Sequence, residues 1–469
     1  ITTISVDMQD IAEKALKEEL IQLQADEGCA VLMEVKTGEV KAIANLIQGD
    51  DGNYYELRNM AVGSIREPGS TFKVASMIVA LEDGVINPTD SIDTGNGTYV
   101  FGKTLMKDHN YDKGGYGKIS ATEVIQYSSN VGMSRIIDRN YKDNPDKFVD
   151  RLYAMKLNED VNLDIPGAGK PYIPHPSDQN VIWDRTKLPW MSIGYNIEIP
   201  PIYTLMFFNA IANNGKMIKP FFVKNYSKNG SIIKTFSTET ICSSICSSST
   251  LNKIRPMLEA VVEKGTAKEA QSKSFKIAGK TGTAQINYGT KGKVMKHQVS
   301  FCGYFPADEP QYSCIVVIFG PKTSYVSGGK MAGTVFKEIA EKVYARNAKR
   351  PVDEVIPDSS KLKTPISKNG NYKQLKTVFS KFDIDMSGDA DEKEWIKSST
   401  HENEVSINPI NTENGLIPNV VGMGAKDAVY LIERLGMRVR LIGKGTVSGQ
   451  SIMPGRRPVK GETVILTLR

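Results

Sequence analysis

The residues best suited to chemistry begin with Ser70 and Lys73, which lie three positions apart at the predicted start of a helix. Pro68-Gly69 predicts a turn, and the apolar spacing from Phe72 onward predicts the helix. Both side chains then share one face near the helix N-terminus, where free backbone N–H groups favour negative charge. Serine becomes a nucleophile when a neighbouring base removes its proton, and a buried lysine can be that base. Alone, the pair is also common at ordinary helix starts, where serine caps the helix.

A second polar set lies at residues 128–130, where the sequence reads Ser-Ser-Asn. Ser120 and Glu123 form a capping-box pattern that predicts a short helix, and this helix delivers Ser128 and Asn130 at its end. Both side chains can project in one direction from such a turn. Ser128 can then relay a proton while Asn130 binds an amide of a substrate. The same pattern also occurs in ordinary helix-terminating turns.

A third set, Lys280-Thr281-Gly282-Thr283, lies in a predicted strand. A phosphate-binding loop is excluded because that motif requires glycine where Ser274 stands, followed by a helix. On a strand edge, Lys280 adds positive charge, Thr281 and Thr283 offer hydroxyls to a carboxylate, and Gly282 lets a ligand backbone approach. We therefore expect a substrate-binding edge here.

Together and in this order, the three sets resemble the S-x-x-K, S-x-N and K-T-G motifs of a class B penicillin-binding protein. The likeness covers about residues 4–348 and is also carried by Arg58–Val62, Ser128–Met133, Ala278–Gln285 and Phe301–Pro306. The resemblance implies an α+β fold of the penicillin-recognising serine transpeptidase type. In that fold a five-stranded antiparallel sheet is flanked by helices, with a helical subdomain beside the active site.

For the reaction, the resemblance implies that Ser70 attacks the D-Ala-D-Ala carbonyl of a peptidoglycan stem peptide, with Lys73 as general base. An amine of a neighbouring stem peptide then resolves the acyl-enzyme, and β-lactams acylate the same serine. No cofactor or metal is expected. Two alternatives stay open: a serine β-lactamase or D,D-carboxypeptidase, and a penicillin sensor or cell-wall-binding protein that does not form cross-links.

The remaining motif residues receive their roles from the same resemblance. Ser128 would pass the proton to the leaving group, and Asn130 would bind the substrate amide. Backbone N–H groups of the nucleophile and of Thr283 would form the oxyanion hole. Lys280, Thr281 and Thr283 would hold the terminal carboxylate of the substrate.

These residues need a frame of helices and strands, which the hydrophobic spacing predicts. Helices are predicted at 6–25 and 330–347, and strands at 30–35, 40–47, 274–286, 297–306 and 311–319. Helical patterns alternate with loops between about residues 70 and 215. Strands on both sides of a helical middle predict one α+β domain over residues 1–350, with its sheet completed late in the chain.

The C-terminal part divides into a predicted linker and a small module. Residues 351–415 are polar and interrupted by prolines, which predicts a linker with one short helix at Tyr372–Phe382. Residues 416–469 predict an α/β module with a helix at Ala425–Leu435 and strands at Arg438–Ile442 and Glu462–Leu468. Its Pro-Asn-Val-Val-Gly opening resembles a PASTA module. That resemblance implies muropeptide binding in some members, and a spacer role is equally open.

An acidic run in the predicted linker matches the spacing of an EF-hand loop. The ligand and turn positions of such a loop would be filled by Asp383, Asp385, Ser387, Gly388, Asp389, Asp391 and Glu394. A single loop without a paired second hand is more often an acidic turn. We therefore expect no metal site.

Composition and charge exclude several other classes of protein. The 469 residues are 40% hydrophobic and 24% charged, which excludes collagen-like, coiled-coil and fully disordered chains. No apolar stretch approaches the 18 residues of a membrane helix, and the five cysteines form no CxxC pair that would indicate zinc. Residues 416–469 carry nine Lys and Arg against three Asp and Glu. Without a basic and aromatic pattern, however, no nucleic-acid partner is expected.

The resemblance also predicts where the chain works. We expect a soluble fragment, excised from its membrane anchor, of a protein at the extracytoplasmic face of the bacterial inner membrane, in the periplasm. Its expected partners are peptidoglycan stem peptides, β-lactams and cell-wall synthesis proteins.

Overall fold

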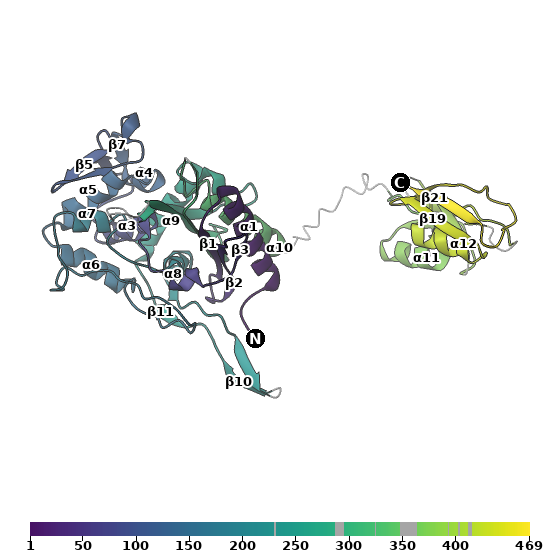
Figure 1. Cartoon of the computed structure of the whole chain (residues 1–469), viewed down its shortest axis with the longest axis horizontal. Helices are drawn as coiled ribbons and strands as arrows, with labels where there is room; N and C mark the ends of the chain where they lie inside the picture. Colours follow the sequence, from purple (N-terminus) through teal and green to yellow (C-terminus); the bar gives the residue numbers. More distant parts are fainter. Residues whose placement is uncertain are drawn as a thin grey trace. The chain divides into compact units, whose positions relative to one another are not determined.

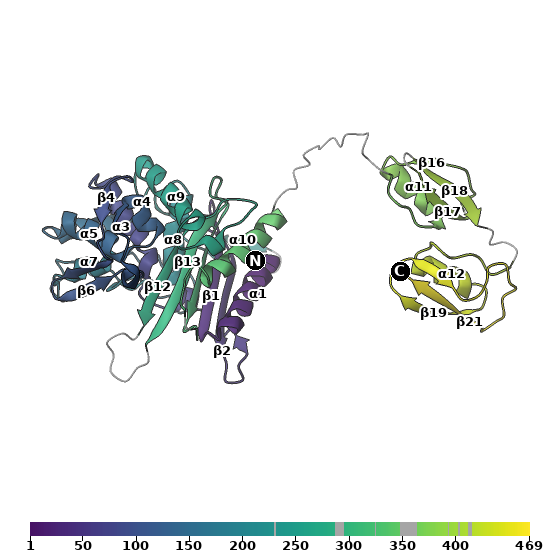
Figure 2. The ribbon, with the colours of Figure 1, turned by 90° about the horizontal axis from the view of Figure 1, so that it is seen from above.

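The computed structural model describes residues 1–228, 231–286, 295–323, 325–347, 364–392, 394–401, 404–410 and 415–469. The chain forms two compact units, Ile1–Ala348 and Lys349–Arg469, each of which is drawn in Figures 1 and 2. None of the helices in these ranges is both long and apolar enough to span a bilayer.

The first unit is built on one antiparallel sheet, whose strand order is β12-β13-β14-β1-β2-β3. The predicted five long strands are present, and the two-residue β3 adds a sixth at the edge. Residues from the two ends of the unit meet in the middle, because β1 pairs with β14 along its full length. The strands are β1 (Glu27–Glu34), β2 (Val40–Gln48), β3 (Tyr54–Tyr55), β12 (Ala278–Ile286), β13 (Lys296–Phe305) and β14 (Tyr312–Phe319).

Helices cover both faces of this sheet. The first and last helices of the unit, α1 (Val6–Leu23) and α10 (Ala332–Asn347), flank the sheet as predicted, and they lie side by side (Figure 2). The rings of Phe301 and Phe305 point from β13 to Phe336 on α10. On the opposite face Cys302 of β13 contacts α8 (Pro201–Ala212), a helix that is apolar all round and therefore buried.

A helical subdomain lies beside β12. It contains α3 (Lys73–Glu82), whose side chains are all buried except that of Glu82. The other elements of the subdomain are helices and two two-stranded sheets, β4 with β7 and β5 with β6. They are α4 (Ala121–Gln126), α5 (Asn130–Tyr141), α6 (Pro145–Ala154), α7 (Lys187–Met191), α9 (Ser248–Glu263), β4 (Ser91–Asp93), β5 (Thr98–Phe101), β6 (Thr104–Lys107) and β7 (Lys118–Ser120). The four-residue helix α2 (Met60–Gly63) packs instead on α8, β1 and β2.

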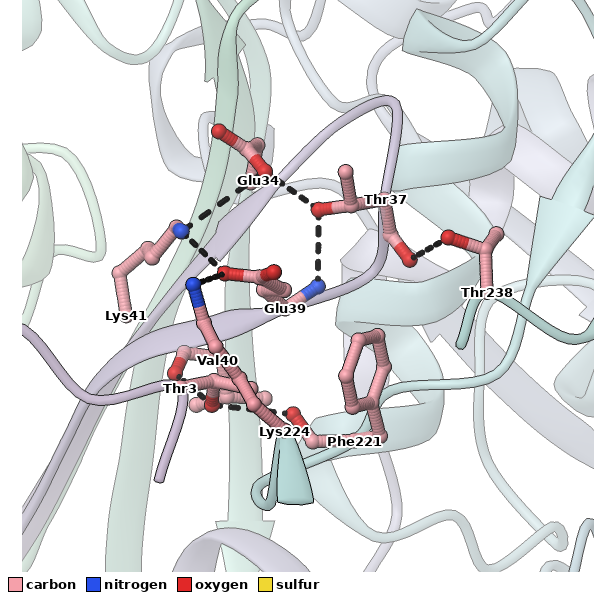
Figure 3. A network of polar contacts seen from close by, with 9 residues as sticks. All are labelled: Thr3, Glu34, Thr37, Glu39, Val40, Lys41, Phe221, Lys224 and Thr238. Carbon is pink, nitrogen blue, oxygen red and sulfur yellow. Dashed lines mark hydrogen bonds and ion pairs between the residues drawn. The ribbon is translucent and has the colours of Figure 1, made fainter. Parts of the chain in front are cut away.

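A network of polar contacts ties the β1–β2 turn to the segment that contains β8 (Met217–Ile218), β9 (Asn225–Lys228), β10 (Ser231–Thr235) and β11 (Thr240–Cys242) (Figure 3). Glu39 forms ion pairs with Lys41 and, at 3.0 Å, with Lys224. Thr238 donates from its hydroxyl to the carbonyl oxygen of Thr37 at 2.9 Å. Burial raises the pKa of Glu39, but the two ammonium groups outweigh burial and lower it. These contacts hold the β1–β2 turn against the β8–β11 segment, in the half of the sheet away from β12.

The predicted linker is wrong for residues 370–410, which fold into a helix and a four-stranded sheet of order β15-β17-β18-β16. The predicted short helix is present as α11 (Tyr372–Lys381). Tyr372, Phe379, Ile396, Val405 and Ile407 form a small core of their own. The strands escaped prediction because they are short and carry many polar residues. They are β15 (Gly370–Asn371), β16 (Asp385–Ser387), β17 (Trp395–Thr400) and β18 (Glu404–Ile410).

The acidic run forms part of this sheet. β16 pairs in parallel with β18, and Asp389 accepts hydrogen bonds from the hydroxyl of Tyr372 at 3.3 Å and the N–H of Ala390 at 3.0 Å. Across the described ranges no three His, Cys, Asp or Glu side chains converge as metal ligands would.

The last module has the predicted helix and strands. They are α12 (Ala425–Glu433), β19 (Arg438–Gly443) and β21 (Thr463–Leu468). β20 (Val447–Gln450) was not predicted, because the glycines around it indicate turns. These elements enclose a second small core around Ile432 and Val464.

Candidate active site

Ser70 lies in a single 3-10 turn, Gly69–Thr71, that leads directly into α3. Gly69 has a φ of +59°, and its N–H donates to the carbonyl oxygen of Gly194 at 3.1 Å. A Cβ atom at Gly194 would lie 2.0 Å from the carbonyl oxygen of Gly69. Close backbone approach between these two glycines therefore fixes the turn that carries Ser70.

Lys73 joins the first two motifs. Its amine lies 3.0 Å from the Ser70 hydroxyl oxygen and 3.2 Å from that of Ser128. It also donates to two carbonyl oxygens, at 2.7 Å to the backbone of Ser128 and at 2.6 Å to the side chain of Asn130. Three of the four residues that the sequence singled out in these motifs thus surround the amine of the fourth, Lys73.

The amine of Lys73 is fully buried. Burial lowers the pKa of Lys73 to about 7, while the negative charge of Asp108 opposes this shift. A lysine with this pKa is about half neutral at pH 7 and can accept a proton. The amine next to Ser70 therefore has the property that a general base requires.

Ser128 and Asn130 owe their positions to two helix caps. The predicted capping box is present: the N–H of Glu123 donates to the Ser120 hydroxyl, and the Glu123 carboxylate accepts from the N–H of Ser120. Ser129 caps α5, which begins at Asn130. Between the two helices Ser128 has a φ of +58°. This left-handed conformation lets its carbonyl group and its hydroxyl face the same amine.

Asp108 was missed by the sequence analysis, although it holds the Ser-Ser-Asn turn in place. Its carboxylate accepts hydrogen bonds from the Ser129 hydroxyl at 2.8 Å and from the backbone N–H groups of Asn130 and Val131 at 2.6 and 3.0 Å. Its side chain is buried. The sequence held no usable signal, because an acidic residue 20 positions upstream in a polar loop indicates only a turn.

The third motif lies on β12, as predicted. Lys280 is fully buried, and its amine donates to the carbonyl oxygen of Thr281 at 3.1 Å and to the hydroxyl of Thr281 at 3.3 Å. Burial and the charge of Lys73 lower its pKa well below the usual value. The Thr281 hydroxyl also bonds the Thr266 hydroxyl at 2.7 Å, which the sequence did not indicate. Thr283 is exposed beside the cleft.

Gly282 has a packing role that the sequence did not indicate. A Cβ atom there would lie 2.2 Å from the Ser300 hydroxyl and 3.3 Å from the carbonyl oxygen of Pro68. The missing side chain thus makes room for protein atoms of β13 and of the turn before Ser70. Gly282 therefore permits close packing of the motif segments.

A cleft of about 640 Å³ brings the three motifs to one surface. Ser70, Ser128, Asn130, Thr281 and Thr283 all line it. Lys73 and Lys280 lie behind this surface, fully buried. A molecule in the cleft would therefore meet hydroxyl and amide groups directly, with two buried amines beneath them.

Comparisons with known proteins agree with this geometry. The family described as the penicillin binding protein transpeptidase domain matches residues 28–341, and the PASTA domain matches residues 416–469. Stage V sporulation protein D of Bacillus subtilis is 25% identical over 401 residues, which cover 82% of this chain and 60% of that protein. Penicillin-binding protein PbpB of Mycolicibacterium smegmatis is 28% identical over 335 residues, which cover 68% and 50%. The chain thus spans half to three-fifths of the length of these two relatives.

Solved structures show the same likeness. The transpeptidase domain of Burkholderia pseudomallei penicillin-binding protein 3 is 26% identical with a TM-score of 0.62, covering 74% of this chain and 96% of that one. Penicillin-binding protein 3 of Mycobacterium tuberculosis, solved with aztreonam, is 26% identical with a TM-score of 0.63, covering 74% and 78%. The family match spans well over half of the chain and contains all three motifs. The chain therefore belongs to the class B penicillin-binding proteins, with a transpeptidase domain followed by a PASTA domain.

Proposed function

We propose that this chain is a peptidoglycan D,D-transpeptidase that cross-links stem peptides through an acyl-enzyme on Ser70, and that β-lactams inhibit it by acylating the same atom. The observation that carries the proposal is the surroundings of the Lys73 amine. Relatives named peptidoglycan D,D-transpeptidase, such as the FtsI homolog of Mesostigma viride at 27% identity, support it.

The proton path follows from counting donors at Lys73. A neutral amine has two N–H bonds and one lone pair, and carbonyl oxygens can only accept. The carbonyl oxygens of Ser128 and Asn130 are the nearest neighbours, at 2.7 and 2.6 Å, so they take the two N–H bonds. The lone pair then faces the hydroxyls of Ser70 and Ser128, at 3.0 and 3.2 Å.

Acylation in this arrangement balances as follows. The Ser70 oxygen bonds to the carbonyl carbon of the penultimate D-Ala residue while Lys73 takes its proton. The bond to the terminal D-Ala breaks, and its nitrogen receives a proton through the Ser128 hydroxyl. The backbone N–H groups of Ser70 and Thr283 would stabilise the oxyanion. An acceptor amine of a second stem peptide would then attack the ester and regenerate Ser70.

The binding roles complete the proposal. Asn130 would bind the substrate amide through its NH₂ group, one of whose hydrogens is already donated to the carbonyl oxygen of Lys107 at 2.8 Å. Thr281 and Thr283 would hold the terminal carboxylate, with the buried Lys280 behind them. Proteins of this family act on extracytoplasmic peptidoglycan, and we propose that location, and partners among cell-wall synthesis proteins, for this chain.

Intact-mass measurement after incubation with penicillin tests the proposal. The native chain should form a stable one-to-one adduct that is absent in Ser70→Ala, and a D-Ala-D-Ala stem peptide with an acceptor amine should release D-Ala and give a cross-linked product. Rapid loss of the adduct would indicate a β-lactamase. A stable adduct without release of D-Ala would indicate a sensor, and no adduct at all would refute the role of Ser70.

A further inference from the structure

The C-terminal unit contains two small folds in succession, residues 364–410 and 415–469, and both have the same topology. In each, a helix is followed by three strands, and the last strand lies between the other two. β18 pairs in parallel with β16 and antiparallel with β17. β21 likewise pairs in parallel with β19 and antiparallel with β20. Three strands after a helix have many other arrangements, so an identical order and direction is a specific likeness.

The spacing along the chain is also the same. α11 begins at Tyr372 and α12 at Ala425, while β16 begins at Asp385 and β19 at Arg438, so each pair is 53 positions apart. The residue before each helix is its N-cap, and it pairs at or next to the second strand that follows the helix. Asn371 pairs with Trp395 of β17, and Gly424 pairs with Thr446, which directly precedes β20. Neither fold has an insertion relative to the other between the start of its helix and the start of its first strand after the helix.

Equivalent side chains have equivalent environments at this 53-residue offset. Phe379 and Ile432 are the buried residues near the end of each helix, and each carbonyl oxygen accepts from the N–H three positions later at 3.1 Å. The residue that ends the turn is left-handed in both cases, with a φ of +50° at Asp383 and +77° at Gly436. A left-handed residue after a helix is usually glycine, as it is in the second fold.

The central strands match as well. Met386 of β16 lies opposite Val405, and its counterpart Val439 of β19 lies opposite Val464. Val405 and Val464 are fully buried, and the next inward positions are Ile407 and Leu466, also buried. The alternation of buried and exposed side chains on the central strand is therefore shared.

We propose that residues 364–410 form a second module of the PASTA type, diverged in sequence, and that the C-terminal unit is a tandem of two such modules. The family match covers only residues 416–469, so the likeness of the first module lies in its topology and spacing. The acidic run from Asp383 to Glu394 is then the helix-ending turn, the first strand and the loop after it. Its EF-hand spacing is coincidental.

The two modules also contact each other. Asn369 donates from its backbone N–H to the carbonyl oxygen of Gly422 at 3.0 Å and from its side chain to that of Val421 at 2.8 Å. The Asn369 side-chain oxygen accepts from the N–H of Ser398 at 2.9 Å. The ring of Trp395 lies 6.0 Å from that of Tyr430, centroid to centroid. The first module therefore binds the Pro-Asn-Val-Val-Gly opening of the second.

Hydrogen exchange of the full chain, measured by mass spectrometry on Asp383→Gly and Gly436→Ala, tests the tandem. Glycine removes the cost of a left-handed side chain, so Asp383→Gly should slow exchange in α11 and β16 by roughly threefold to fivefold. Gly436→Ala should speed exchange in α12 and β19 by a similar factor, because a Cβ there meets only the Lys460 side chain, at 3.5 Å, and the remaining cost is the backbone conformation.

The same experiment with 1 mM Ca²⁺ separates the tandem from a metal loop. The tandem predicts protected amides at β16 and β18 in the native chain and no effect of calcium. Unprotected amides at 385–387 and 404–407 would overturn the proposal. Calcium-dependent protection that is lost in Asp383→Gly would overturn it in favour of an EF-hand loop.

A second inference rests on the proposed function and on a different group. We infer that Asp108 is a positioning residue for acylation, because one buried carboxylate fixes both the turn at Ser129 and the start of α5 at Asn130. Asp108 lies at the cleft, but its described hydrogen bonds go to Ser129, Asn130 and Val131, so it acts through the residues that surround Lys73. The charged groups that face Lys73 are Asp108 and Lys280, and His109 lies beside them.

Penicillin acylation rates of Asp108→Asn, measured from pH 5 to 9, test this role. An asparagine oxygen can replace part of the acceptor set but not all three bonds, so we expect the plateau rate to fall by about tenfold to a hundredfold. Loss of the Asp108 charge also removes the effect that raises the pKa of Lys73, so the acidic limb should move to lower pH. A role in folding alone would lower the rate without moving the limb.

The exposed Asp112→Asn is the matched control and should leave the rate and the limb unchanged. If the native chain is acylated and Asp108→Asn has the native rate and profile, the role of Asp108 is refuted while the proposed function stands. If the native chain is not acylated at all, the proposed function fails, and the role of Asp108 fails with it.

Discussion

The two units of the chain bury different kinds of side chain. In the transpeptidase unit Lys73 and Lys280 are fully buried and Asp108 is 1% exposed. In the described part of the C-terminal unit, Asn369 is the one polar side chain that is buried, and it joins the two modules. Burial of charge costs free energy unless the group is fully hydrogen-bonded. Lys73, Lys280 and Asp108 are therefore buried at the proposed reaction site, whereas the C-terminal unit is packed for stability and contact between its modules.

The largest effect that would sharpen this comparison is expected for Lys73→Met. Methionine keeps the apolar stem but removes the base, so the penicillin acylation rate should fall by about 10² to 10⁴. Removal of the buried amine stabilises the folded state, whereas two carbonyl groups left without a hydrogen-bond donor destabilise it. The unfolding midpoint should therefore stay within roughly 5 °C of native. Lys264→Met, an exposed lysine at the same cleft, is the control and should acylate normally. Acylation of Lys73→Met at the native rate would show that the buried amine of Lys73 is not the base.

Gly194→Ala tests the backbone that carries the nucleophile. Its Cβ would overlap the Gly69 carbonyl group and shift Ser70, and a displacement of about 1 Å costs on the order of a hundredfold in rate. Gly84→Ala provides a matched control, since Gly84 also has a positive φ, +67°, but a Cβ there meets nothing within 4 Å. Acylation kinetics of both variants should separate the clash from backbone strain. Equal rates in the two variants would show that the contact does not position Ser70.

The pH dependence of acylation tests the burial of Lys73 directly. Because the neutral amine is the active form and its pKa is about 7, the rate should rise with pH and gain about tenfold between pH 6 and 8. Stopped-flow measurement with a chromogenic β-lactam gives this profile. A rise in rate centred near pH 10, the ordinary range of lysine, would mean that burial does not lower the pKa of Lys73.

The smallest effect on chemistry is expected for Asn369→Ala. The variant loses one side-chain hydrogen bond between the modules, to Val421, and one within the first module, from Ser398. The free energy of unfolding of the C-terminal unit should therefore fall by about 1 to 2 kcal/mol. The acylation rate of the transpeptidase unit should not change. Thermal unfolding and penicillin labelling of the same sample give both values, and altered labelling would show that the two units are coupled.

The sequence predicted those parts of the fold that rest on local periodicity. The five long strands of the sheet, α1 and α10 have regular apolar spacing, and the site residues stand in short motifs with strict order. Asp108 could not be found, because its role depends on a hairpin that brings a polar loop under a turn 20 residues later. The first C-terminal module was missed because its strands are short and its core has five buried residues. The packing role of Gly282 was also missed, because the sequence does not show that Ser300 lies against that position.

The conformation of Ser128 limits the substitutions that evolution can accept at this position. The position demands a left-handed backbone, so that the carbonyl group faces Lys73, and also a hydroxyl. Glycine and asparagine adopt that backbone readily but lack the hydroxyl, and threonine has the hydroxyl on a branched side chain that disfavours it. A lineage under selection by β-lactams can therefore vary the rim of the cleft, but at Ser128 every single replacement gives up one of two functions. Resistance that arises by substitution should accumulate around this residue and leave the residue itself unchanged.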